Sequence, residues 1–181
     1  LLAELSGAKG ADVYQEVARL YPDTRYGLAA RYELARIAGQ AGRVDEALTQ
    51  VKALIEVLPK QGADKNMAAL RRDALFAAAE FAFRKPDYKA SEEFLTAYRE
   101  LAGDADPRAD DVERKRAWCR QEAGDTAGAA QILDAALKTF PKSSFRDEML
   151  YLRAVSAVKA GAPDDALKFL ETLLSEFPAS A

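Results

Sequence analysis

The chain has 181 residues, of which 49% are hydrophobic and 30% are charged, and its formal net charge is −3. This composition is typical of a globular protein with ample apolar material for a core, and its mild acidity argues against a nucleic-acid or anionic-membrane surface. With 0 histidines and 1 cysteine, Cys119, the chain has no histidine-based triad or metal site, no intrachain disulfide and no cysteine-cluster zinc site.

The sequence contains no run of about 18 apolar residues, so we expect no transmembrane segment. The chain begins at Leu1, without an initiator methionine and without a signal-peptide pattern. We therefore interpret the sequence as a piece of a longer protein.

Apolar side chains recur at helical spacing from the start of the chain. Residues 1–22 are expected to be the end of a preceding repeat, because their apolar residues share one helical face and Pro22 ends the helix. Residues 23–59 are expected to form one repeat of two helices, the first of which ends near Gly39 and Gly42. The second helix follows the i, i+3, i+4, i+7 rule. Its apolar residues are Val44, Ala47, Leu48, Val51, Leu54, Ile55 and Leu58.

The remaining repeats follow the same plan. An irregular repeat is expected over 64–102, with a break at Lys85 and Pro86, and a polar linker containing glycine and proline covers 103–107. Further repeats are expected over 107–141 and 142–178. No β pattern occurs, so the sequence predicts an all-α chain.

Two distant stretches match without a gap. Residues 21–59 and 140–178 share three landmarks at one offset of 119 residues. The pairs are Pro22 and Pro141, Gly42 and Gly161, and Pro59 and Pro178. Such internal repetition predicts a solenoid of stacked helices.

A small residue near the start of each second helix is expected to mark where paired helices cross closely, because a large side chain would hold the helices apart. The markers are Ala47, Ala90, Ala129 and Ala166, at spacings of 43, 39 and 37 residues.

These units resemble tetratricopeptide repeats. In that family a small residue lies in the first helix, glycine at the turn, alanine at the opening of the second helix and proline after it. The matching residues are Ala35, Gly42, Ala47 and Pro59; Ala78, Ala90, Phe94 and Ala97; Ala117, Gly124, Ala129, Ala136 and Pro141; Ala154, Gly161, Ala166 and Pro178. The second unit departs from the pattern, with Lys85 in place of the turn glycine and Ala102 in place of the final proline.

The resemblance implies an α-α superhelix of about four helix-turn-helix repeats plus an N-terminal half repeat. It also implies a non-catalytic scaffold, without a cofactor or a metal, that binds a peptide or a partner protein in a concave groove lined by the first helices. The positions that the pattern places in this groove are Tyr32, Arg36, Arg72, Leu75, Arg114, Trp118, Tyr151 and Val155. Arginines suit peptide carboxylates, and aromatic rings supply contact area at low entropic cost.

Structural interpretations stand beside these candidates. A tyrosine or tryptophan on a solenoid helix can also pack against the next repeat, which we favour for Tyr151, while both interpretations stay open for Trp118. Exposed arginines are commonly solvated, so none of Arg36, Arg72 and Arg114 alone indicates a binding site. Their expected position on one shared face is what favours a role in binding.

Other functions are less well matched. The carboxylate clamp of co-chaperone members needs lysine and asparagine at set groove positions, and the only asparagine, Asn66, lies elsewhere. The acidic pairs Asp110-Asp111 and Asp164-Asp165 could act as acid and base, but carboxylates are also favoured at helix starts, which is the stronger interpretation.

The aromatic-proline junctions resemble those of bacterial envelope members, such as the lipoprotein of the β-barrel assembly machine and the Tol-Pal coordinator. They are Tyr21-Pro22-Asp23-Thr24, Phe140-Pro141-Lys142-Ser143 and Phe177-Pro178-Ala179-Ser180. This resemblance implies a periplasmic or outer-membrane-associated scaffold; the alternative is a cytoplasmic adaptor domain attached to an enzyme or signalling module. The apolar face of the last helix further predicts self-association through open terminal faces.

Overall fold

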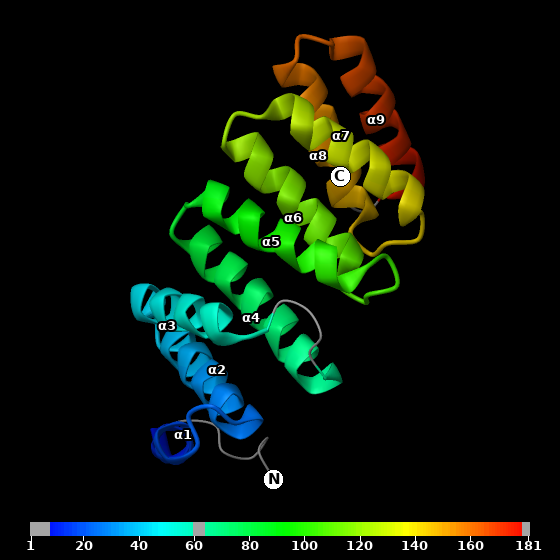
Figure 1. Cartoon of the computed structure of the whole chain (residues 1–181). Coiled ribbons are helices and arrows are strands. Elements are labelled where there is room, and N and C mark those ends of the chain that lie inside the picture. The colour runs from blue at the N-terminus through cyan, green and yellow to red at the C-terminus, as the bar shows by residue number, and fades with distance from the viewer. Residues whose placement is uncertain (1–7, 60–63, 179–181) are drawn as a thin grey trace. The chain divides into compact units, whose positions relative to one another are not determined.

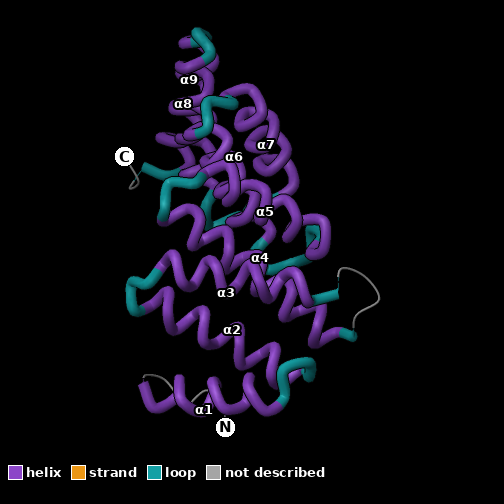
Figure 2. Tube along the Cα trace, turned by 60° about the vertical axis from the view of Figure 1, so that its left-hand side comes forward, coloured by secondary structure: helices purple, strands orange, loops and turns teal. Residues whose placement is uncertain are grey.

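The computed structural model describes residues 8–59 and 64–178 of the chain. Within these ranges it contains nine α-helices and no strand, which confirms the predicted all-α fold (Figures 1 and 2). The helices are α1 Ala8–Leu20, α2 Arg25–Gln40, α3 Val44–Val57, α4 Lys65–Arg84, α5 Tyr88–Ala102, α6 Ala109–Glu122, α7 Thr126–Thr139, α8 Arg146–Lys159 and α9 Pro163–Glu176. Residues 1–7 of the expected half repeat, and Ala179 and Ser180 of the last junction, lie outside the described residues.

The chain divides into two compact units, Leu1–Asp87 (unit 1) and Tyr88–Ala181 (unit 2). In unit 1, α2 packs against α1 and α3, and α4 packs against α3 and α2. In unit 2, α6 packs against α5 and α7, α8 packs against α7 and α6, and α9 packs against α8. Each of the four expected repeat ranges holds two helices, and the boundary between the units falls inside the range 64–102.

Side-chain caps and left-handed turns set the helix ends. Asp64 accepts hydrogen bonds from the amides of Asn66 and Met67, at 2.8 and 3.1 Å, and so caps α4. After α2, α6 and α8 the chain turns through a glycine with a φ near +80°, a conformation that other residues rarely adopt. These glycines are Gly42, Gly124 and Gly161.

The register of the second repeat differs from the prediction. The residue at the close helix crossing is Ser91, which is 1% exposed, whereas the predicted marker Ala90 is only half-buried. After each first helix an amide donates to the carbonyl five residues earlier, and these amides are Arg43, Asp87, Asp125 and Ala162. These four amides follow one another at spacings of 44, 38 and 37 residues. The crossing residues have the same spacings once Ser91 replaces Ala90. The turn position is therefore taken by Pro86, not by Lys85.

Both helices of a pair contribute fully buried side chains to the core. In unit 1, Ala47, Val51 and Leu54 of α3 are fully buried. In unit 2, Leu133 of α7 belongs to a cluster that includes Met149 of α8. The first helices α4, α6 and α8 also carry fully buried side chains, so the core draws on both helices of a pair.

Candidate functional site

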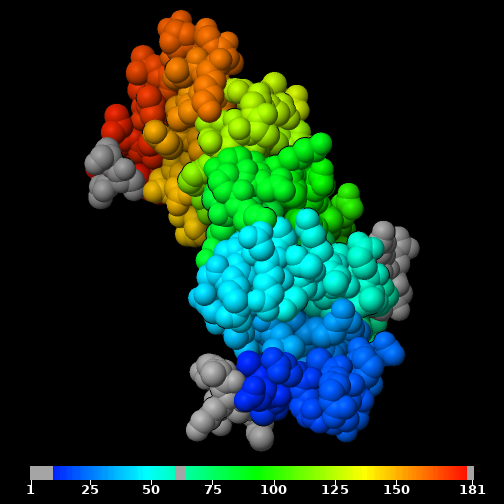
Figure 3. All heavy atoms as spheres, turned by 90° about the vertical axis from the view of Figure 1, so that its left-hand side faces the viewer, coloured from blue at the N-terminus to red at the C-terminus, as the bar shows by residue number. Residues whose placement is uncertain are grey.

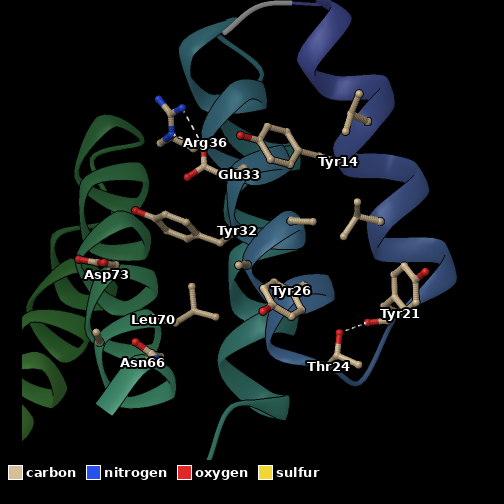
Figure 4. Close-up of a pocket in the computed structure, with 15 residues that line it drawn as sticks. Tyr14, Tyr21, Thr24, Tyr26, Tyr32, Glu33, Arg36, Asn66, Leu70 and Asp73 are labelled. Carbon is tan, nitrogen blue, oxygen red and sulfur yellow. Dashed lines mark hydrogen bonds and ion pairs between the residues drawn. The ribbon is translucent and has the colours of Figure 1, made fainter. Parts of the chain in front are cut away.

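A cavity of about 990 Å³ opens in unit 1 between α1, α2 and α4 (Figure 4). Fifteen residues line it, and more than half of them carry apolar or aromatic side chains. They are Val13, Tyr14, Val17, Tyr21, Thr24, Tyr26, Ala29, Ala30, Tyr32, Glu33, Arg36, Asn66, Ala69, Leu70 and Asp73.

Four tyrosines form the aromatic part of the lining: Tyr14, Tyr21, Tyr26 and Tyr32 (Figure 4). Tyr14 is 5% exposed and anchors the α1 side, whereas Tyr26 is 58% exposed. The guanidinium of Arg25 lies 4.6 Å from the centroid of the Tyr26 ring and donates a hydrogen bond to its hydroxyl. This hydrogen bond raises the pKa of Arg25. The cation therefore holds one side of an otherwise exposed ring in place.

The polar lining is slightly acidic. Glu33 accepts a hydrogen bond from Arg36 at 2.8 Å, so these two charges offset each other. Asp73 and Asn66 project from α4 towards the same space (Figure 4). Two carboxylates and one guanidinium give the lining a formal charge of −1.

The spacing of residues along two helices explains why these side chains meet. On α2, Tyr26, Ala29, Glu33 and Arg36 follow a helical spacing of three or four residues and so share one face. On α4, the lining residues Asn66, Leu70 and Asp73 do the same. Because α4 packs against α2, the two faces enclose one space.

The predicted groove residues of unit 1 have different surroundings. Tyr32 and Arg36 line the cavity, and Arg72 is half-buried outside its lining. Leu75 is only 2% exposed and belongs to the core, so it offers no surface to a ligand. The 44-residue spacing makes Phe76 and Glu80 the positions equivalent to Tyr32 and Arg36. The register shift of the second repeat accounts for the difference.

In unit 2, Arg114 is committed to internal contacts. It is 9% exposed, donates hydrogen bonds to Asp111 at 2.6 Å and Glu148 at 2.7 Å, and stacks on the ring of Phe145. It therefore links α6 to α8.

The other predicted residues of unit 2 present more surface. Trp118 is 36% exposed, Tyr151 is 56% exposed, and Val155 is half-buried. The exposure of Tyr151 leaves its ring accessible on α8.

Sequence reasoning missed several cavity residues, among them Tyr14, Tyr26, Asn66, Leu70 and Asp73. Tyr26 could have been found by extending the face of Tyr32 and Arg36 one turn towards the N-terminus. The α4 residues required the correct register of the second repeat. Asn66, which does not match a carboxylate clamp, lines the cavity instead.

A second cavity, of about 350 Å³, lies in unit 2 among α5, α6 and α7. Its charged groups pair with one another: Glu113 accepts from Arg99 at 2.7 Å and from Arg116 at 2.8 Å, and Arg99 also pairs with Asp104. This smaller cavity therefore offers mostly neutralised charges.

The remaining chemical candidates have structural surroundings. Asp110 accepts a hydrogen bond from the Ser143 hydroxyl at 2.6 Å, and Asp111 pairs with Arg114 and Lys115. Among residues 8–59 and 64–178, no group of three side chains of the metal-binding types is placed to hold an ion. Over the same ranges, no helix is both long and apolar enough to cross a membrane.

Comparison with solved structures finds similar folds at low sequence identity. The crystal structure of YrrB, described as a TPR protein with an unusual peptide-binding site, is 14% identical with a TM-score of 0.75, over 98% of this chain and 80% of that chain. A crystal structure of MamA is 14% identical with a TM-score of 0.74, over 99% and 93%. Residues 41 to the end of MamA from Desulfovibrio magneticus RS-1 are 11% identical with a TM-score of 0.73, over 96% and 87%.

Comparison of the sequence with curated proteins finds no match. Two family models, both described as tetratricopeptide repeat, match residues 32–109 and 120–181. These ranges include helices of both units, and the repeat they describe is the helix pair seen in the structure. The chain therefore belongs to the tetratricopeptide-repeat family, whose members are protein-interaction scaffolds.

Proposed function

We propose that the chain is a non-catalytic scaffold that holds a peptide segment of a partner protein in the cavity of unit 1. The observation that carries the proposal is the cavity itself, with its volume of about 990 Å³ and its aromatic lining. Cavities of this size with apolar walls and a few polar groups are typical ligand sites.

The lining favours a peptide with an apolar or aromatic side chain next to a basic one. Tyrosine rings bury large area with little rotamer entropy to lose, so Tyr26 and Tyr32 suit an apolar anchor. The formal charge of −1 favours a lysine or arginine beside that anchor. The peptide-binding site named for YrrB, a protein with the same fold, supports the choice of a peptide over a small metabolite.

A peptide-display selection on the immobilised 181-residue chain tests the proposal. Selected peptides are labelled, and their dissociation constants are measured by fluorescence anisotropy for wild type, Tyr26→Ala and Tyr151→Ala. The two tyrosines are equally exposed, at 58% and 56%, but only Tyr26 lines the cavity. We expect Tyr26→Ala to weaken binding by at least about tenfold, as for a truncated anchor, and Tyr151→Ala to leave it unchanged.

The opposite pattern would contradict the cavity proposal. If Tyr151→Ala weakens binding and Tyr26→Ala does not, peptides bind the first helices of unit 2 instead. A selection that yields no peptide enriched in basic and apolar residues would also count against the proposed ligand.

We also propose a cellular location for the scaffold. The aromatic-proline junctions at Tyr21-Pro22 and Phe140-Pro141 support a scaffold in the bacterial envelope. Cell fractionation with an antibody against the chain tests this location, and recovery in the cytoplasmic fraction would favour the adaptor alternative.

A further inference from the structure

Large apolar side chains on α8 and α9 are exposed at helical spacing. Tyr151 and Val158 lie seven residues apart on α8, and Leu167 and Leu174 lie seven residues apart on α9. Their exposed fractions are 56%, 61%, 56% and 54%. The two helices pack together and adjoin at the surface, in orange and red in Figure 3. We call the surface that carries these four side chains the α8–α9 face.

The equivalent residues of unit 1 are covered. With the gapless offset of 119 residues, Leu167 corresponds to Leu48 and Leu174 to Ile55, which are 7% and 8% exposed. Because α2 packs on α3 as α8 packs on α9, those partners do not explain the difference. What unit 1 has in addition is α4, packed on both α2 and α3.

Unit 2 repeats this arrangement one repeat earlier. There α8 is the helix that packs on α7 and α6, and its Met149 joins Leu133 of α7 in one core cluster. Leu137 and Phe140 of α7 pack against the same cluster. With the 37-residue spacing, Leu137 corresponds to Leu174. The α8–α9 face thus repeats a surface that is covered by a helix at two other places in the chain.

Both covering helices make the same polar contact. Arg71 of α4 donates a hydrogen bond to the carbonyl of Ile55 at 2.7 Å, and Arg146 of α8 donates one to the carbonyl of Leu137 at 3.3 Å. These carbonyls are equivalent, and so are the two arginines. The next equivalent carbonyl is that of Leu174. The third first helix that follows a repeat, α6, has Ala109 at the equivalent position and cannot make this contact. The arginine contact therefore occurs in two of the three cases.

Where a covering helix crosses the preceding first helix, the two residues that meet differ in size: one is large and the other is small. A Cβ added to Gly39 of α2 would lie 2.3 Å from Phe81 of α4, so the missing side chain makes room for the ring. At the equivalent crossing, the larger Gln121 of α6 meets the small Ser156 of α8 at 3.2 Å. On the α8–α9 face, Val158 is the residue equivalent to Gly39 and Gln121. Because Val158 has a side chain, we expect a small residue opposite it in the covering helix.

We propose that the α8–α9 face docks an amphipathic helix of a partner protein. This helix carries an arginine that donates to the carbonyl of Leu174, apolar residues three and four positions later, and a small residue ten positions after the arginine. The spacing is that of Arg71, Ala74, Leu75 and Phe81 in α4 and of Arg146, Met149, Leu150 and Ser156 in α8. The inference concerns unit 2 alone and does not depend on the cavity of unit 1.

A labelled peptide of residues 64–84, carrying Phe81→Ser, is the probe. Its binding to the 181-residue chain is measured by fluorescence anisotropy. We expect saturable binding that Leu174→Glu in the chain weakens by at least about tenfold, because the change puts a charge on the apolar contact. In the peptide, restoring Phe81 and replacing Arg71→Met are each expected to weaken binding about five- to tenfold.

Two variants of the chain serve as controls. Val57→Glu alters a residue of α3 that is as exposed as Leu174, at 54%, and is expected to leave peptide binding unchanged. Tyr26→Ala removes a cavity residue of unit 1. Unchanged binding of the probe peptide to this variant separates the inference from the proposed cavity function. Circular dichroism shows that each variant keeps its helices.

Three results of the binding measurements would overturn the inference. The peptide fails to bind; it binds Leu174→Glu as tightly as wild type, which would mean that it occupies another surface; or the Phe81 peptide binds better than the Phe81→Ser peptide. The self-association expected from the sequence is the competing use of this face, and sedimentation of the chain alone distinguishes the two: a monomer agrees with the inference. A dimer that Leu174→Glu dissociates would show that a second copy occupies the face, which also overturns the inference.

Discussion

Arg71 is a buried cation whose partners are backbone carbonyls rather than carboxylates. The last carbonyls of a helix have no partner within the helix, and Pro59 closes this one. Arg71 donates to the carbonyls of Ile55 and Leu58, both at 2.7 Å, while only 7% exposed. One side chain thus satisfies the end of α3 and fixes the position of α4.

Arg71→Met is expected to destabilise the chain by roughly 2–4 kcal/mol, because the buried carbonyls lose their charged donor. Urea unfolding followed by circular dichroism measures the loss. The control Arg43→Met removes only the exposed pair with Glu46 and is expected to cost less than about 1 kcal/mol. Equal effects of the two variants would contradict the role given to Arg71.

Glu176 is a residue whose effect depends on pH. Its hydrogen bonds with Arg146, at 2.6 and 3.0 Å, lower the pKa of its carboxyl below the ordinary value of 4.5. A lowered pKa in the folded state gives stability that is present above the unfolded pKa and is lost as pH falls through the folded pKa. The pair therefore stabilises the chain at neutral pH but not in acid.

Glu176→Gln should accordingly lower the melting temperature at pH 7 and leave it unchanged well below the folded pKa. Because the pair is partly exposed, the decrease at pH 7 is expected to be at most about 4 °C. Thermal melts of both proteins, at pH 7 and at a pH well below the folded pKa of Glu176, measure the change in melting temperature. Glu171→Gln, an exposed change on the same helix, is the control, and an equal loss there would argue against a specific pair.

At the scale of the element, Gly39 lets α2 and α4 cross closely. The ring of Phe81 takes the space that a side chain at Gly39 would need, with Cε1 only 2.3 Å from the position of a Cβ. Two helices that approach in this way depend on both residues together.

Gly39→Ala is expected to cost about 1–3 kcal/mol through overpacking, partly offset by the higher helix propensity of alanine. Phe81→Ala should cost about 3–5 kcal/mol by leaving a cavity. The double variant should be more stable than the sum of the two losses predicts, by about 1 kcal/mol or more, because the new methyl group occupies part of that cavity. Urea titrations of all four proteins measure this coupling, and additive losses would contradict the close crossing.

The sequence predicted the helices well, because apolar spacing and turn glycines act within a few residues of each other. It failed at the register of the second repeat, where Ala90 and Ser91 are both small and the buried one is polar. That single shift placed Leu75 in the groove, although it lies in the core. The cavity could be predicted only in part, through Tyr32 and Arg36, because its other wall depends on how α1 and α4 pack against α2.

At the scale of the whole molecule, each unit has a core of its own. The cluster around Leu133 in unit 2 draws its residues from α6, α7 and α8. Solenoid stability is approximately a sum over repeats and their neighbouring interfaces. Unit 2 is therefore expected to fold without unit 1.

A fragment of residues 88–181 should show helical circular dichroism and a cooperative urea transition. In it, Leu133→Ala should cost about 2–5 kcal/mol, as in the full chain, because the contacts that it loses are local. A gradual transition without a midpoint, or a loss that differs widely between fragment and full chain, would contradict independent folding.

The neighbour-only packing also bears on how the chain folds. Within each unit, the helices that pack together are adjacent in the chain or next-but-one. Contacts between residues close in sequence require little loop closure, and chains dominated by such contacts fold quickly. A ribosome that releases this protein from its N-terminus thus delivers each helix soon after the earlier helices that it packs against, so folding can keep pace with synthesis.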